Sequence, residues 1–113
     1  FAVRGNCRQL EDISGKEIDQ VTICGGWSAS DFWSQMVADT LGVAVHRPEV
    51  SEASALGAGI CAGVGAGEYS DMAQAVSKLV AMRSPLEPRP ECRDAYDHAY
   101  ERWATLSSMP MPR

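Results

Sequence analysis

Several common signs of function are missing from this sequence. It has no CxxC pair and no cluster of cysteine and histidine, so we expect no metal site. It has no block of like charges, which argues against a polybasic membrane patch and an acidic tail. The longest apolar stretch, residues 53–67, is too short to span a bilayer, and no signal-peptide pattern is present. We therefore expect a cytoplasmic protein with no membrane partner.

The charge balance is acidic. Ten Lys and Arg residues against fifteen Asp and Glu residues give a net charge of −5. A surface of this sign repels phosphate backbones, so we expect no nucleic-acid partner.

The four cysteines are widely spaced, and each lies within or beside an apolar segment. A reduced cysteine in such a place behaves as a small hydrophobic residue. Reduced thiols are therefore favoured over the alternative, a secreted scaffold with two disulfides. The cysteines are Cys7, Cys24, Cys61 and Cys92.

The bulk composition is that of an ordinary globular protein. Of the 113 residues, 45% are hydrophobic and 22% are charged, which excludes intrinsic disorder. Glycine and proline are scattered without a period, which excludes a collagen and a coiled-coil rod. The first residue is Phe1 rather than Met, and we expect the chain to be a piece of a longer protein.

The first part of the chain predicts a helix followed by a strand. Apolar residues at helical spacing predict a helix that ends at Gly15. The β-branched run over residues 20–24 predicts a short buried strand, which Gly25 and Gly26 end abruptly. The helical stripe consists of Val3, Cys7, Leu10 and Ile13.

A second helix and a second strand follow. Ser28 and Asp31 have the spacing of a capping box, and Gly42 is placed to end the helix. Residues 43–46 predict another strand, which Pro48 stops. We expect one apolar helix face to be buried: Phe32, Trp33, Met36, Val37 and Leu41.

The remainder of the chain predicts helices only. Ser51 and Glu52 open a third helix rich in Ala and Gly, and Ser70 or Asp71 opens a fourth. We expect four apolar residues of that fourth helix to face inward: Met72, Val76, Leu79 and Val80. A connector with Pro85, Pro88 and Pro90 leads to a last helix that carries Tyr96, Tyr100 and Trp103.

Single helices between strands predict a parallel α/β sheet. Two parallel strands make a poor sheet on their own, because parallel sheets are normally buried on both faces. The pattern is therefore typical of half a domain. We divide it into an α/β core over residues 1–84, a connector and closing helix over 85–108, and a frayed tail over 109–113.

The strongest candidate site is the turn between the first strand and the second helix. Gly25 and Gly26 lack a Cβ, so an anion can approach the main chain, and a helix N-terminus favours phosphate. Trp27 offers a flat surface suited to a nucleobase. The alternative is a tight turn without a ligand, in which Trp27 is a core residue.

Other candidate motifs are weaker. Residues 57–63 have a GxGxxxG spacing, but no strand precedes them, so a stripe of small residues that allows close helix packing is favoured over a dinucleotide fingerprint. No GxxxxGK[ST] phosphate loop is present. His46 and His98 are interpreted as structural or surface residues. Asp31 and Asp39 are interpreted as a cap and a solvated face, and they suggest no acid–base pair.

Three segments in order resemble the C-terminal domain of the FGGY carbohydrate kinases. They are the loop at Gly25 and Gly26, residues 35–42 (QMVADTLG) and residues 47–58 (RPEVSEASALGA). Residues 88–103 also resemble the closing helix of that family. The resemblance implies part of an RNase-H-like lobe of the actin/Hsp70/sugar-kinase superfamily, with parallel strands, flanking helices and a helical C-terminus.

The resemblance also implies a function. These enzymes transfer a phosphoryl group from ATP, with Mg²⁺, to a hydroxyl of a sugar or polyol. Gly26 would present its backbone to the ATP phosphates, Gly25 would make the turn, and Ser30 would reach toward the nucleoside. Trp27 stands where the family has a small residue, and its expected contact is adenine. Gly57 would serve close packing.

The catalytic Asp of such kinases lies upstream of Phe1, so we expect no catalytic residue in this chain. The expected partners are the remainder of the kinase chain and a sugar or polyol bound mainly by that remainder. A homo-oligomer is left open. One alternative is a non-catalytic nucleotide-binding or regulatory module of the same superfamily. Another is an independent structural α/β domain.

Overall fold

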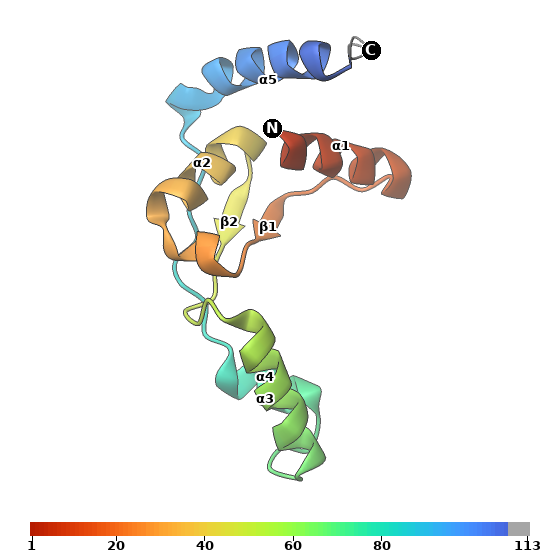
Figure 1. Cartoon of the computed structure of the whole chain (residues 1–113), viewed down its shortest axis with the longest axis vertical. Coiled ribbons are helices and arrows are strands. Elements are labelled where there is room, and N and C mark those ends of the chain that lie inside the picture. Colours follow the sequence, from red (N-terminus) through yellow and green to blue (C-terminus); the bar gives the residue numbers. More distant parts are fainter. Residues whose placement is uncertain (109–113) are drawn as a thin grey trace, which may run out of the picture.

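The computed structural model describes residues 1–108; the predicted tail over 109–113 lies outside the described residues. Helices and short strands alternate in the predicted order, as Figure 1 shows. The elements are α1 (Ala2–Ser14), β1 (Gln20–Thr22), the 3₁₀ turn η1 (Gly26–Ala29), α2 (Asp31–Leu41), β2 (Ala44–His46), α3 (Ala53–Gly65), α4 (Met72–Leu79), the 3₁₀ turn η2 (Pro90–Cys92) and α5 (Arg93–Ser107).

The two strands form the predicted parallel sheet. β1 pairs with β2 in a register that places Val21 opposite Val45. The side chain of Val45 is fully buried, which makes it the centre of this small sheet. β1 is shorter than predicted, although the Ile23 amide still donates to the His46 carbonyl at 3.0 Å before the chain turns away.

A third extended segment lies antiparallel to β2 and comes from the proline-rich part of the chain. Val45 and Leu86 exchange two backbone hydrogen bonds of 2.9 Å. Further along, the Arg83 amide donates to the Arg47 carbonyl at 2.8 Å. Residues 81–86 thereby cover the edge of β2, which no local pattern in the sequence predicts.

Helix α1 ends at Gly15, as predicted, in the left-handed conformation (φ 65°). The predicted apolar stripe of α1 is not buried, because Ile13 is 84% exposed and Leu10 is 58% exposed. The helix packs through a polar residue instead: Arg4 is buried, forms an ion pair with Asp97 of α5, and lies over the Tyr100 ring.

Helix α2 begins two residues later than the capping-box prediction implies. Ser30, not Ser28, is the N-cap, and its Oγ accepts a hydrogen bond from the Trp33 amide at 3.4 Å. Ser28 lies inside η1, where its hydroxyl donates to the Gly25 carbonyl. The prediction that α2 ends at Gly42 is confirmed, with φ 74° at that glycine.

The predicted inner face of α2 is wrong at two of its five residues, whereas Met36, Val37 and Leu41 are half-buried. Phe32 is 68% exposed and Trp33 is 44% exposed. The buried residues of α2 are Ser34, Ala38 and Asp39, because this face of the helix packs against β2 and the chain around residue 89.

Asp39 was expected on a solvated face, and that expectation is also wrong. Its side chain is fully buried and accepts hydrogen bonds from the Arg89 backbone (2.8 Å), from the Arg89 guanidinium (2.6 and 3.0 Å) and from Gln35 (3.0 Å). Burial raises the pKa of the carboxyl, but the hydrogen bonds from Arg89 and Gln35 outweigh it and leave the pKa below its ordinary value. Gln35 also donates to the Glu87 carbonyl at 2.8 Å, so α2 is fastened to the connector twice.

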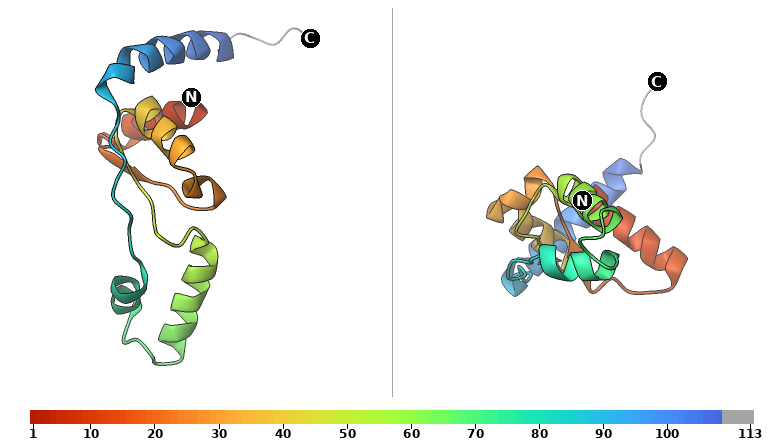
Figure 2. Two further views of the ribbon diagram at one scale, coloured as in Figure 1. Left: turned by 90° about the vertical axis from the view of Figure 1, so that its left-hand side faces the viewer. Right: turned by 90° about the horizontal axis from the view of Figure 1, so that it is seen from below.

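Helices α3 and α4 form a hairpin that projects from the sheet (Figures 1 and 2). The glycine-rich segment lies inside α3, so the structure excludes a dinucleotide fingerprint there. A Cβ on Gly63 would lie 2.9 Å from the Tyr69 ring, which confirms close packing at that position. At Gly57 a Cβ would meet nothing within 4 Å, so no close packing occurs there among the described residues.

Asp71 caps α4 by accepting a hydrogen bond from the Gln74 amide at 2.8 Å, as one of the two predicted starts requires. Three of the four apolar residues expected to face inward are exposed, at 46% for Met72, 43% for Val76 and 36% for Leu79, whereas Val80 is half-buried. Ala75 is fully buried instead, in a short helix that lies against α3.

The molecule is elongated, as the left view of Figure 2 shows. It measures 56 × 36 × 29 Å, and its radius of gyration is 17.9 Å, against about 13 Å for a compact protein of this length. The accessible surface is 7986 Å², compared with roughly 6,100 Å² for a compact monomer of the same mass. No helix within residues 1–108 combines the length and apolar character that crossing a bilayer requires.

The elongated shape accompanies a small core. Among the described residues the buried apolar side chains are Ala38, Val45, Ile60, Ala75 and Tyr100.

We predict that Asp39→Asn lowers the free energy of unfolding by about 2 kcal/mol, because it weakens charge-assisted hydrogen bonds to Arg89. The folded state depresses the pKa of Asp39, so its contribution is complete near neutral pH and is lost as the pH falls through that depressed pKa. The stability difference between the two proteins should therefore be constant from about pH 5 to 7 and shrink below about pH 4.

Urea unfolding of the purified protein at several pH values measures this difference. Asp12→Asn is the matched control, because Asp12 is exposed on α1 and makes no ion pair within the described structure. Equal stability of the Asp39→Asn and Asp12→Asn proteins at pH 7 would contradict the assigned role of Asp39.

Candidate functional site

The turn after β1 has a backbone that only glycine adopts readily. Gly25 has φ 84° and ψ −175°, a region that is essentially restricted to glycine. Gly26 has no such constraint and begins η1. A Cβ placed on either glycine would meet nothing within 4 Å among the described residues, so the main chain of the turn faces open space.

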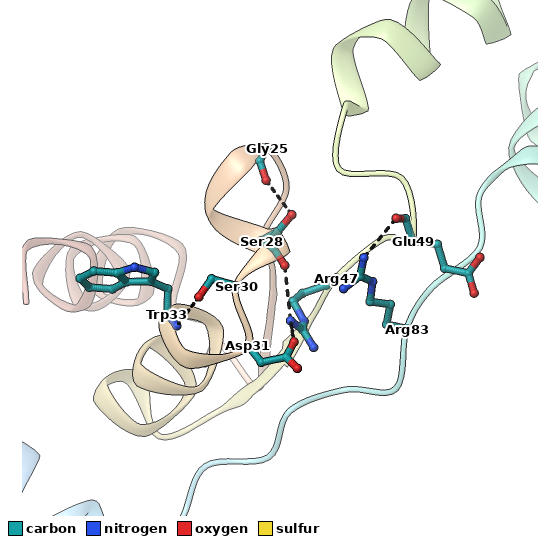
Figure 3. Close-up of polar contacts among 8 residues, drawn as sticks. All are labelled: Gly25, Ser28, Ser30, Asp31, Trp33, Arg47, Glu49 and Arg83. Atoms are coloured by element: carbon teal, nitrogen blue, oxygen red, sulfur yellow. Dashed lines mark hydrogen bonds and ion pairs between the residues drawn. The ribbon is translucent and has the colours of Figure 1, made fainter.

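Hydrogen bonds hold this turn closed on its inner side (Figure 3). The Gly25 carbonyl accepts from the Ser28 amide at 3.0 Å and from the Ser28 hydroxyl at 2.7 Å. Ser28 is 2% exposed, so this contact lies beneath the turn. The Gly25 amide donates to the Ser51 carbonyl at 2.9 Å, which attaches the other side of the turn to the chain after β2.

Helix α2 begins directly after this turn. Ser30 is its N-cap, with the side chain engaged by the Trp33 amide, and Asp31 is its first residue. The first amides of a helix and the helix dipole attract anions. The open glycine backbone and the start of α2 therefore adjoin one another, as the sequence predicts.

Aromatic residues form an exposed group beside the turn. Trp27 is 71% exposed, so it does not belong to the core that residues 1–108 form among themselves. Its ring centroid lies 5.2 Å from that of Trp33, and Trp33 lies 5.7 Å from Phe32 with the rings nearly perpendicular. A planar apolar surface is thus present next to the glycines.

Arg47 lies beneath the site, and local sequence reasoning assigned it no role. It follows β2, is 5% exposed, and donates through Nη1 to the Asp31 carboxylate at 2.6 Å and to the Ser28 carbonyl at 3.4 Å (Figure 3). The hydrogen bond from Arg47 holds the pKa of Asp31 below its ordinary value. These partners are 16 and 19 residues away in sequence, a separation that no local pattern reports.

Of the remaining sequence candidates, Cys24 directly precedes this turn and His46 directly precedes Arg47. His98 is exposed on α5, and His46 is half-buried at the end of β2. All four cysteines are free in the structure. A cleft of about 430 Å³ opens between α1 and the turn after α2, lined by side chains of both charges. Within residues 1–108, no three His, Cys, Asp or Glu side chains gather into a metal-binding group.

Comparison with protein families identifies the lineage. Residues 1–66 match the model of the C-terminal domain of the FGGY family of carbohydrate kinases. The chain belongs to this family. The sequence resemblance and the fold class predicted from it are thereby confirmed, since kinases of known structure also share the small parallel sheet and flanking helices.

Individual FGGY relatives show how much of a kinase this chain represents. It is 41% identical over 101 residues to an autoinducer-2 kinase of Enterobacter sp. (strain 638) and 42% identical to one of Salmonella paratyphi B. Each alignment covers 89% of this chain and 19% of the relative. The chain therefore spans about a fifth of the length of these curated relatives.

Solved structures of kinases also resemble this chain in fold. A xyloylose kinase from Brucella ovis superposes with a TM-score of 0.73 at 29% identity, covering 93% of this chain and 21% of that protein. The xylulose kinase from Rhodospirillum rubrum superposes with a TM-score of 0.67 at 26% identity and the same coverage. The arrangement of helices and strands is thus shared with FGGY kinases over nearly all of this chain.

We predict that Gly25→Ala destabilises the protein by about 1–3 kcal/mol, because alanine disfavours φ 84° even where its Cβ has room. Gly26→Ala is the matched control, since its Cβ also has room and its φ is not positive. Thermal unfolding of the two variants beside the parent measures the difference. Equal stability of both variants would contradict the assigned backbone constraint.

Proposed function

We propose that this chain forms the nucleotide-side part of a carbohydrate kinase that transfers a phosphoryl group from ATP to a hydroxyl of a sugar or polyol. The observation that carries the proposal is the open glycine turn at the start of α2, in a chain of the FGGY family. Such a turn offers main-chain donors and a helix N-terminus to a phosphate without any side chain in the way.

Each proposed contact uses a feature of the turn. Gly26 presents its backbone to the ATP phosphates, and Gly25 provides the bend that exposes it. Ser30 is the residue that reaches toward the nucleoside: its Oγ accepts from the Trp33 amide, and its hydroxyl proton is free to donate. Trp27 supplies an exposed ring against which adenine can stack.

Mg²⁺ accompanies ATP in this proposal, but the described residues do not build a site for it. They contain no metal-binding group of three or more ligands, and Asp31 beside the turn is already paired with Arg47. This chain therefore contributes to nucleotide binding, and the metal is held by ATP and by other parts of the kinase.

The proposed partner is the remainder of the kinase chain, which holds the catalytic Asp and most contacts to the sugar. The exposed stripe of α1 supports this partner, since Leu10 and Ile13 lie on an unpartnered face of a helix in an elongated molecule. Residues 1–84 would pack into that kinase as its α/β core and residues 85–108 as connector and closing helix. The cytoplasm, where thiols stay reduced, suits the four free cysteines.

We predict that Gly26→Val in the full-length kinase weakens ADP binding at least tenfold without lowering the thermal midpoint. Valine places two methyl groups in the open space where phosphates would approach, and no described residue occupies that space. Calorimetric titration with ADP measures the affinity. Gly59→Val is the control, because its Cβ also meets nothing within 4 Å and it lies in α3. Unchanged ADP affinity in Gly26→Val would refute the proposed loop.

We predict that the isolated 113-residue chain shows no sugar-dependent ATP turnover, whereas the full-length kinase does. Phosphoryl transfer depends on positioning and charge stabilisation by a closed cleft, of which this chain supplies one side. A coupled ADP-release assay with a panel of sugars and polyols compares the two. Turnover by the isolated chain would contradict the assignment, and no turnover by either would favour the non-catalytic binding module.

A further inference from the structure

The guanidinium of Arg47 connects three segments beneath the glycine turn. One nitrogen, Nη1, contacts both the middle of η1 through the Ser28 carbonyl and the first residue of α2 through the Asp31 carboxylate. Arg47 itself follows β2. A single buried side chain thus ties the turn and the start of α2 to the sheet, as Figure 3 shows.

The backbone around Arg47 is fixed independently. Its carbonyl accepts from the Arg83 amide at 2.8 Å, and the Glu49 amide donates to the Ala81 carbonyl at 2.9 Å. Residues 47–49 are therefore held by the antiparallel segment that covers β2. The guanidinium projects from a rigid base, so the turn is held in one position relative to the sheet.

The contacts of the buried Arg47 guanidinium are not the ones expected if its role were only to stabilise the fold. The Nε atom of Arg47 is buried without a hydrogen-bond partner in the described structure, and its charge is balanced by Asp31, whose side chain is 81% exposed. A buried charge with an unmade hydrogen bond is costly, and an apolar side chain of similar volume often serves stability better. The planar guanidinium does supply what an apolar side chain cannot: directed contacts to two groups on different segments.

We propose that Arg47 is a positioning residue, which holds the glycine turn in the conformation that receives the nucleotide. This inference rests on the proposed function of the same turn. Arg47 acts through Ser28 and the start of α2, and it makes no contact with the nucleotide itself. Without it, the Gly25 carbonyl keeps its hydrogen bonds from Ser28, and the Gly25 amide keeps its bond to the Ser51 carbonyl. The Ser28 carbonyl and the Asp31 carboxylate lose their contacts to the end of β2.

Arg47→Met in the full-length kinase tests this role. We expect the Kd for ADP and the KM for ATP to rise about tenfold, the KM for the sugar to stay within twofold, and the amides of residues 26–30 to exchange hydrogen at least tenfold faster. Arg83→Met is the matched control: Arg83 also lowers the pKa of Asp31 through its charge, but its side-chain hydrogen bond goes to the Glu49 carbonyl and not to Ser28 or Asp31, so all four quantities should stay within twofold of the parent. Arg47→Lys should restore part of the ADP affinity, since lysine keeps the charge but not the planar fork.

Asp31→Asn provides a second variant that keeps Arg47. The Asp31 side chain is exposed, so its replacement preserves folding while weakening the contact from Nη1, and we expect a smaller change in the same direction. An ADP affinity and exchange rate that match the parent in both Arg47→Met and Asp31→Asn would overturn the inference. If the Arg47→Met protein does not fold, a parental ADP affinity and exchange rate in the Asp31→Asn protein would also overturn the inference.

The Gly26→Val protein separates this inference from the function on which it rests. Weaker ADP binding in Gly26→Val, with normal binding in Arg47→Met, would overturn the role of Arg47 alone. Normal ADP binding in Gly26→Val would overturn the proposed nucleotide site, and the role of Arg47 with it.

Discussion

The position of α2 depends on two charged contacts, one at each end of the helix. Arg47 holds the first turn through Asp31, and Arg89 holds the buried Asp39 near the last turn. Both arginines lie in extended segments beside the small sheet, so the helix is oriented by directed hydrogen bonds more than by an apolar core. The position of the glycine turn depends on this helix, because the turn is followed by Ser30, the N-cap of α2.

This reliance on polar contacts follows from how little apolar surface the chain buries by itself. The sheet has two strands of three residues each, and β2 is covered on its far edge by residues 81–86. Directed contacts align segments accurately, and the buried ones also stabilise the fold, but exposed ion pairs add little net stability in water. An elongated chain with exposed aliphatic residues on α1 and α4 is therefore suited to packing within a larger kinase.

The open side of the turn and its closed side serve different purposes. Above Gly25 and Gly26 there is space for a ligand, and below them Ser28 and Arg47 are buried. The proposed phosphate-binding role needs both features, because main-chain donors must be accessible and must also stay in place when a ligand arrives. The exposed ring of Trp27 adds a flat apolar surface beside this turn.

The sequence by itself determined the order of the elements, the helix ends at Gly15 and Gly42, and the bend at Gly25, because these depend on local backbone preferences. Hydrophobic periodicity failed on α2, where the tertiary structure buries Asp39 and exposes Phe32. The tertiary structure alone decided the partners of Asp39 and of Arg47, which lie 50 and 16 residues away in sequence. No local pattern records such separations, since only the folded chain brings those groups within hydrogen-bonding distance.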